Sequence, residues 1–271
     1  MTNYKNKLFS AIEPVIGMQS LPAEESNERS FLEDRARIRQ SIGDLERQQN
    51  LERIVELALN ETPEGVSELP ATRDWLRLFF DLAQDVYDET AQQIWARMLA
   101  LYIANPDTVS KRSLIALHGM DVWELKAFVE YCSFAFTLEN GWRFVFEEAI
   151  TRREMWGYVQ GQDYTQHFIN IGLLSAELAV MRPRSSKGMK IRYFYKEYEL
   201  VQAIPTAELG PLGEAVDISF GYRKFTPTGQ QISKAVNARV YNGYARNLIR
   251  TMDTHRNVQF RLLETEKAFA C

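Results

Sequence analysis

Apolar residues recur at helical spacing near the start of the chain. Between residues 26 and 60 they stand three to seven positions apart among charged neighbours, which predicts one long helix with a thin apolar stripe. This stripe comprises Phe31, Ile38, Ile42, Leu45, Leu51, Val55 and Ala58. A helix this polar is not expected to stand alone, so we expect it either to cross the body of the protein or to pair with a second copy.

The next stretch predicts further helices. Two are expected between Thr72 and Tyr102, and their spacings place four large apolar side chains on facing stripes. We expect one buried cluster there, made of Trp75, Phe79, Trp95 and Leu99. A turn at residues 105–107, a short helix at 110–117 and a helix at 121–136 follow.

Strand-like patterns begin near residue 136. Asn140-Gly141 is the favoured pair for a two-residue type I′ turn and separates two short apolar segments, which predicts a hairpin. A short helix follows at 164–171. Further strands are expected at 177–181, 189–201 and 217–225, the first two joined by a basic turn at 182–188, and Thr226-Pro227 then opens a helix with a hydroxyl cap.

The chain is therefore expected to be mainly α with a smaller α+β part. We divide it into an N-terminal lead-in (1–25), a helical module with the long first helix (26–120) and an α/β module (121–271). A chain of 271 residues can bury a sizeable core without disulfides or a structural metal. Its 45% hydrophobic and 25% charged residues are ordinary for a globular protein.

Residues 74–133 contain a motif that extends over several of the predicted helices. It consists of Asp74-Trp75, Phe79-Phe80, Ala83-Gln84-Asp85-Val86, Gln92, Trp95-Ala96, Leu99-Ala100, Pro106, Ser110, Arg112 and Leu114. This motif resembles an uncharacterised bacterial family, catalogued as a domain of unknown function, and more distantly the alpha-type abortive-infection proteins. Tyr87 and residues 105–107 depart from the family pattern at turns. The resemblance implies a helical fold and a bacterial setting, and it brings no activity.

The second half has a pattern of its own. Ile171-Gly-Leu-Leu174 follows a short helix, a basic hairpin comes next, and residues 222–232 run from a strand into a Thr-Pro-x-Gly helix start. This order is similar to the closing parts of winged-helix domains. The resemblance implies a winged-helix-like module after the helical one, a fold that binds either protein or DNA.

Motifs for catalysis and metal binding are not recognisable. His118, His167 and His255 are far apart, and no HExxH or paired CxxC pattern occurs, so we predict no metal site. There is no Gly-x-Ser-x-Gly elbow and no phosphate loop. Cys132 lies in an apolar stretch, where a thiol is usually an inert hydrophobe. We therefore assign no catalytic residue and no cofactor.

Charge is divided unevenly along the chain. Residues 1–150 carry 15 Lys and Arg against 25 Asp and Glu, whereas residues 151–271 carry 17 against 11, within a net charge of -4. The most basic segment is interleaved with aromatic residues, and its candidate nucleic-acid-binding residues are Arg182, Arg184, Lys187, Lys190 and Arg192. Such a segment can place cations along a phosphate backbone. The alternative is a solvated loop whose aromatic residues pack into the core.

From these patterns we expect a non-enzymatic regulatory or protein-interaction protein, with a protein partner or self-association through residues 26–60. One alternative is a nucleic-acid-binding regulator, for example in antiviral defence, and another is a hydrolase without a recognisable motif. The apolar runs are too short to cross a membrane, so no membrane partner is expected. Two cysteines, Cys132 and Cys271, form no disulfide framework, which favours a cytoplasmic location.

Overall fold

The computed structural model describes residues 28–63, 65–147, 152–153, 155, 163–181, 189–202, 220–256 and 258–263. The predicted lead-in and the basic turn at 182–188 lie outside these residues. So do three of the basic candidates, Arg182, Arg184 and Lys187. Within the described part, no helix combines the length and the apolar character that a bilayer crossing requires.

The first half of the chain is helical, as predicted. Its elements are α2 (Glu28–Leu59), α3 (Arg73–Ala83), α4 (Glu89–Ala104), the 3₁₀ helix η1 (Pro106–Thr108), α5 (Lys111–His118) and α6 (Val122–Cys132). Polar side chains start these helices, because they satisfy backbone N–H groups that have no partner in the first turn. The Asp88 carboxylate accepts from the N–H of Ala91 at α4, and the Ser110 hydroxyl accepts from that of Ser113 at α5.

The helix α6 is shorter than predicted. It ends at Cys132, and Phe136 already begins the first strand, whereas the apolar pattern predicted a helix to residue 136. Phe134 and Phe136 are both fully buried. A short run of buried apolar residues fits a helix and a strand equally well, which explains the error.

The second half contains an antiparallel sheet. Its strands are β1 (Phe136–Leu138), β2 (Arg143–Phe146), β3 (Leu174–Met181), β4 (Met189–Tyr193), β5 (Lys196–Gln202), β6 (Phe220–Phe225) and β7 (Val258–Leu263), in the spatial order β3-β6-β2-β1-β4-β5-β7. The helices α8 (Thr165–Asn170), α9 (Pro227–Ala235) and α10 (Asn242–Arg256) accompany it. A mainly helical chain with strands in its second half is thus confirmed. The winged-helix assignment is not confirmed, since the described residues already form a sheet of seven strands.

The strands β1 and β2 form the predicted hairpin with a different turn. Leu138 N donates to Trp142 O, and Gly141 N donates to Leu138 O, both at 2.9 Å, so the loop has three residues. Gly141 has a φ of 81°, while Asn140 does not have a positive φ. The predicted type I′ turn requires positive φ at both central residues and is therefore wrong. A three-residue loop with glycine in the left-handed conformation forms instead.

The pairing of the later strands also differs from the prediction. The single strand expected at 189–201 is two strands, because the chain turns at Phe194 and Tyr195, whose aromatic side chains give no turn signal. The predicted hairpin of β3 and β4 is wrong, since β6, β2 and β1 lie between these two strands. The sequence patterns did not predict α10 or β7.

Helices cover both faces of the sheet. On one face, Phe136 packs against Tyr193, at 5.0 Å between ring centroids, and against Tyr244 of α10, at 6.3 Å. On the other face, Phe225 lies 5.9 Å from Phe128 of α6. Buried residues of both halves of the chain belong to one continuous hydrophobic core.

The helix α9 connects the sheet to the helical half, since it packs against α4 and α5 as well as β6. The side-chain oxygen Oε1 of Gln231 accepts a 2.9 Å hydrogen bond from the N–H of Ser110, at the start of α5. At its own start, the Thr226 hydroxyl caps α9 and Gly229 lies against the backbone of Leu173. A Cβ on Gly229 would lie 1.9 Å from Leu173 O, so this close approach requires glycine.

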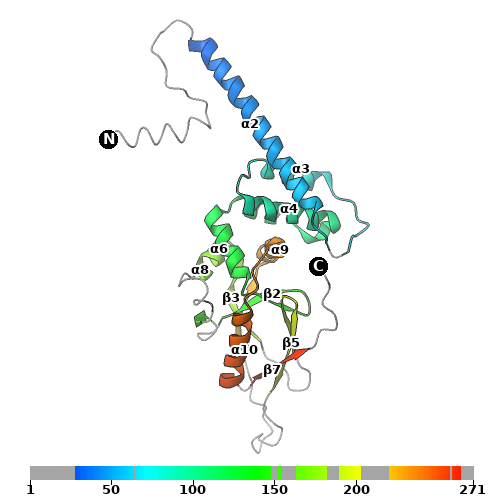
Figure 1. Ribbon diagram of the computed structural model, residues 1–271, viewed down its shortest axis with the longest axis vertical. Helices are drawn as coiled ribbons and strands as arrows, with labels where there is room; N and C mark the ends of the chain where they lie inside the picture. The colour runs from blue at the N-terminus through cyan, green and yellow to red at the C-terminus, as the bar shows by residue number, and fades with distance from the viewer. Residues whose placement is uncertain are drawn as a thin grey trace, which may run out of the picture.

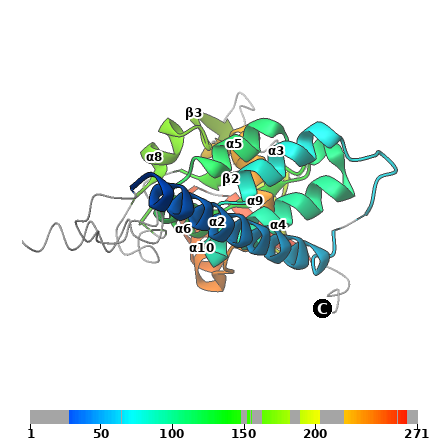
Figure 2. The same cartoon turned by 90° about the horizontal axis from the view of Figure 1, so that it is seen from above.

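The long helix α2 extends beyond the rest of the described protein. Figure 1 shows it in blue, with its C-terminal half beside α3 and α4 and its N-terminal half projecting away. Seen from above in Figure 2, it crosses the helical end of the molecule. The helix predicted for residues 26–60 is confirmed.

Candidate anion-binding pocket

Two arginines flank one threonine across three neighbouring strands. Thr137 on β1 is directly opposite Arg143 on β2 and Arg192 on β4. Residues that are directly opposite in antiparallel strands point to the same face of the sheet, with Cβ atoms about 4.5–5.5 Å apart. The register therefore places both arginine side chains on one face, on either side of Thr137.

A cavity of about 580 Å³ lies over this row. Its lining comes from β1, β2, β4, their turns and the C-terminal parts of α6 and α9: Cys132, Ala135, Thr137, Gly141, Arg143, Arg192, Phe194 and Lys234. Three of these residues are cationic, and none carries a carboxylate. The volume falls in the range of about 300–1,000 Å³ that is typical of small-ligand sites.

Arg143 is held in place by α9. Its guanidinium donates to the Ser233 carbonyl, and its backbone N–H donates to Gln230 Oε1 at 2.9 Å. Gln230 Nε2 in turn donates to Gly141 O at 2.8 Å, so one glutamine binds both ends of the hairpin turn to the helix. Burial lowers the pKa of Arg143, and the positive charge of Arg192 acts in the same direction. An arginine nevertheless stays protonated in proteins, so the pocket keeps this charge.

The three cations lack a carboxylate partner in the described part of the chain. Ion pairs are found at many other arginines there, but none joins Arg143, Arg192 or Lys234 to an acidic side chain within 4.0 Å. Two carboxylates are neighbours of these cations: Glu197 is opposite Arg192 on β5, and Glu61 lines a second cavity together with Lys234. Like charges that share one cavity repel each other and attract an anion.

A strained aromatic residue borders the pocket. Phe194 has a φ of 52°, which makes it the one non-glycine residue of the described chain with a positive φ. Neighbouring contacts hold this turn: the Tyr193 hydroxyl donates to Ser133 O at 2.8 Å and accepts from Tyr241 N at 3.1 Å. Backbone strain of this kind costs about 1–3 kcal/mol and is concentrated at functional sites.

The thiol in the pocket is not prepared for covalent chemistry. Cys132 is buried, and burial raises its pKa to about 12. The thiolate, not the thiol, is the nucleophile, so very little reactive form exists at neutral pH. Cys132 contributes apolar surface to the cavity.

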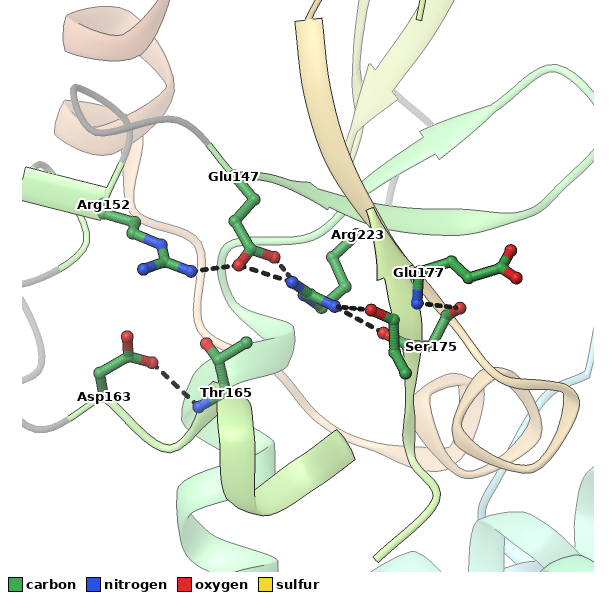
Figure 3. A network of polar contacts seen from close by, with 8 residues as sticks. Glu147, Arg152, Asp163, Thr165, Ser175, Glu177 and Arg223 are labelled. Carbon is green, nitrogen blue, oxygen red and sulfur yellow. Dashed lines mark hydrogen bonds and ion pairs between the residues drawn. The ribbon is translucent and has the colours of Figure 1, made fainter. Parts of the chain in front are cut away.

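A second polar cluster lies on the same face of the sheet, toward its β3 edge, and is drawn in Figure 3. Arg223 of β6 binds both carboxylate oxygens of Glu147, which follows β2, and one of these bonds is 2.8 Å long. Arg152 binds the same carboxylate. Both partners of the central pair are about nine-tenths buried. Burial alone would raise the pKa of Glu147, but the hydrogen bonds from Arg223 and Arg152 outweigh it, so its pKa is lowered.

This cluster has a structural role. The pairing of β3 with β6 shifts register between Leu174 and Leu178, which leaves backbone groups in between without ladder partners. Arg223 donates to the carbonyls of Ser175 and Ala176 there, at 2.6 and 3.2 Å. Since four of the five N–H donors of its guanidinium are taken by Glu147 and these carbonyls, Arg223 holds a bulge in place.

His167 lies beside a carboxylate of α6. Within the described residues, no group of three or more His, Cys, Asp or Glu side chains could hold a metal ion. His167 Nε2 lies 2.6 Å from Glu124 Oε1, and the other Glu124 oxygen accepts from Asp121 N at the start of α6. His167 thus belongs to a helix-capping network.

The candidate residues from the sequence analysis are divided between the cavity, the exposed part of β4 and the buried core. Arg192 lines the cavity, and Lys190 is exposed two residues earlier on β4, on the same face. Four other residues, Trp75, Phe79, Trp95 and Leu99, are all buried, between 0% and 7% exposed.

Sequence reasoning did not find Arg143 and Lys234. The sequence does mark Arg143, because it is a cation within the apolar run Trp142 to Phe146. A charged residue in such a run is seldom buried unless it has a partner or a function. Nothing local marks Lys234, since a lysine near a helix C-terminus is common.

Comparison with known proteins identifies one family. The model of DUF2806, described as a protein of unknown function, matches residues 34–249, from within α2 to within α10. Neither a curated protein nor a solved structure matches the chain. The similarity to abortive-infection proteins is not confirmed. Because the match extends over well over half of its length, the chain belongs to the DUF2806 family of proteins of unknown function.

Proposed function

We propose that this protein is a non-catalytic regulatory protein whose pocket binds the phosphate group of a small phosphorylated molecule. One observation carries the proposal: Arg143, Arg192 and Lys234, from β2, β4 and α9, line one cavity without a carboxylate. Guanidinium groups match phosphate oxygens with paired N–H donors, and an ammonium adds a further charge. A phosphate would also relieve the mutual repulsion of the three cations.

The position of the pocket supports a regulatory role. Arg143 and Arg192 belong to the sheet and Lys234 to α9, so a ligand that contacts all three would strengthen the attachment of α9 to the sheet. The same helix contacts α5, where Gln231 accepts from the Ser113 hydroxyl at 2.5 Å and from the Ser110 N–H. Binding would thereby influence the helical half. The protonated, buried Cys132 supports binding without covalent catalysis.

Nucleic-acid binding is the second candidate, because exposed Lys190 and Arg192 lie on one face of β4 and lead into the cavity. However, Glu199 and Glu197 stand directly opposite these two residues on β5. Alternating acidic neighbours interrupt a track of phosphate contacts, whereas a single phosphate group needs only the three cations that line the cavity. The observations therefore favour a small ligand over a nucleic acid.

Calorimetric titration with four probes tests the proposal: inorganic phosphate, pyrophosphate, adenosine monophosphate and a mixed-sequence DNA duplex at 50 mM salt. We expect saturable binding of at least one of the three small anions. Arg192→Gln and Lys234→Gln should each weaken it about tenfold or more, because a hydrogen bond to a charged group contributes roughly 1.5–3 kcal/mol. Lys190→Gln is the matched control and should bind as the wild type does, since Lys190 does not line the cavity.

Two other results of the titration would contradict the proposal. Absence of heat and of thermal stabilisation with all three small anions would overturn it. Binding of the duplex alone, weakened by Lys190→Gln as much as by Arg192→Gln, would support the nucleic-acid alternative. In that case the slope of log affinity against log salt should fall by roughly 0.9 for each DNA phosphate that the variant no longer binds.

A further inference from the structure

The projecting half of α2 exposes large apolar side chains. No residue from 32 to 49 is buried, although this segment is about 27 Å of continuous helix. Within it, Ile38, Ile42 and Leu45 are 59%, 50% and 63% exposed. Isolated helices of this length are marginal in water, and their stability in proteins comes from packing of an apolar face.

These side chains face away from the body of the protein. The body-facing side of α2 is marked by Arg47, which binds Asp85 at 2.9 Å, by Asn50, which donates to Gln84 O at 3.0 Å, and by the fully buried Ile54. At 3.6 residues per turn, the centre of this side lies roughly 140° around the helix from the Ile38, Ile42 and Leu45 stripe. The apolar stripe is therefore not an extension of the intramolecular contact. The body touches the flank of the stripe at Glu46, whose carboxylate accepts a 3.5 Å hydrogen bond from the Tyr87 hydroxyl.

The charges beside the stripe fit a second α2 that runs in the opposite direction. An antiparallel register that places Ile42 opposite Leu45 of the second copy also places Arg35 opposite Glu52 of that copy. On the flank of the stripe, Arg39 and Glu46 share one side of the helix, so Arg39 meets Glu46 of the second copy. The two-fold symmetry of such a pair forms each contact twice.

A parallel pair lacks this complementarity. It would place Arg35 against Arg35 and Glu52 against Glu52 of the second copy, at positions that face the partner. Like charges in facing positions destabilise a helix pair. The antiparallel arrangement also places the two protein bodies at opposite ends of the paired segment.

We propose that this surface, the α2 stripe of Ile38, Ile42 and Leu45 with its flanking charges, binds the same surface of a second copy in an antiparallel, two-fold symmetric helix pair. The paired segment spans residues 35–52. The inference is independent of the ligand proposed for the pocket.

Sedimentation equilibrium of the full chain at micromolar concentration is the first test. We expect a particle of twice the 31.4 kDa chain mass for the wild type and a single chain for Ile42→Glu. Ile115→Glu is the matched control, because Ile115 on α5 is 59% exposed and lies far from the stripe. Ile115→Glu should leave the helical circular dichroism and its melting unchanged, whereas Ile42→Glu should lower the helical signal only by the part of α2 that loses its partner.

A charge exchange tests the register. Arg39→Glu should weaken the dimer about tenfold, because it places two like charges together at both symmetric contacts. Adding Glu46→Arg should restore it in the antiparallel pair. In a parallel pair, Arg39 would meet Asp34 of the second copy, so Glu46→Arg would bring no recovery. Arg37→Glu, with the same change of charge on the outer surface of α2, should leave the dimer unchanged.

Cysteine cross-linking tests the direction, with Cys271→Ser as background and buried Cys132 kept. A mixture of Ile38→Cys and Gln49→Cys chains should form a disulfide, whereas neither variant should cross-link with itself, since the two copies of each position would lie about 16 Å apart. Self-cross-linking of Ile38→Cys would overturn the antiparallel pair. A monomeric wild type would overturn the proposal entirely, and it is the result expected if another part of the same chain covers the stripe. A dimer that Ile42→Glu leaves intact would also overturn it.

Discussion

Arg143 and Arg192 stand on the two strands on either side of β1, and both side chains line one cavity in which no acidic residue neutralises them. Arg143 is fixed by a hydrogen bond to the Ser233 carbonyl, while Arg192 is exposed. The two cations therefore differ in what they contribute to the stability of the ligand-free protein, although both contribute to anion binding.

Neutralising these two arginines should have unequal effects on folding. Arg192→Gln should change the free energy of unfolding by less than about 0.5 kcal/mol, because it removes an exposed charge that is repelled by its neighbours. Arg143→Gln should lower it by about 1–3 kcal/mol, since the partly buried guanidinium bonds to α9. Urea denaturation without added anions measures both values. If both variants lost the same free energy of unfolding, Arg192 would have a stabilising contact beyond those described above.

The aromatic cluster of the helical half should be sensitive to truncation. Trp95 is 1% exposed, and its ring lies 5.3 Å from that of Phe79. Trp95→Ala should lower the free energy of unfolding by about 3–5 kcal/mol, because the lost burial adds to the cost of a cavity. Trp123, which is 47% exposed, provides the matched control. Trp123→Ala should cost clearly less in the same urea titration, about 1–2 kcal/mol, because it removes only ring contacts with Tyr164 and His167 at the surface.

The Glu147 and Arg223 pair should make stability depend on pH in acid. The pKa of folded Glu147 lies below the usual value of 4.5, so the pair stabilises the protein above about pH 4.5, and this stabilisation is lost as the pH falls through the folded pKa. Glu147→Gln should remove that part of the pH dependence. It should also lower the free energy of unfolding at pH 7 by about 3–5 kcal/mol, because buried Arg223 loses its counter-charge.

Chemical denaturation at intervals between about pH 3 and pH 7 measures this effect. An unchanged slope in Glu147→Gln would mean that other carboxylates govern acid unfolding. Glu139→Gln is a control of the same kind on an exposed residue of the hairpin loop, and it should leave both stability and slope unchanged.

The raised pKa of Cys132 predicts slow alkylation. With a pKa of about 12, its thiolate at pH 8 is about a thousandfold scarcer than that of an ordinary cysteine. In a Cys271→Ser background, iodoacetamide should leave the native protein unmodified over hours and should modify it rapidly in urea. Mass spectrometry follows the reaction. Fast modification of the native chain would identify Cys132 as a reactive residue of the pocket.

Much of the secondary structure was predictable from particular residues. The stripe of Ile38, Ile42 and Leu45 predicted α2, and the hydroxyl caps Ser110 and Thr226 marked the starts of α5 and α9. The predictions failed where the chain turns without a turn residue, as at Phe194, and where a buried apolar run fits helix and strand alike, as at Phe136. In each failure, long-range packing outweighed the local preference.

The sequence by itself determined the helices, their caps and the apolar faces, because spacing along a helix and hydrogen bonds to its first turn involve residues only a few positions apart. Only the tertiary structure decided the sheet order and the candidate pocket. Arg143, Arg192 and Lys234 are distant in the chain, and strand register together with the docking of α9 brings them to one cavity. A shift of register by one residue would turn either arginine to the opposite face, and no local pattern encodes that choice.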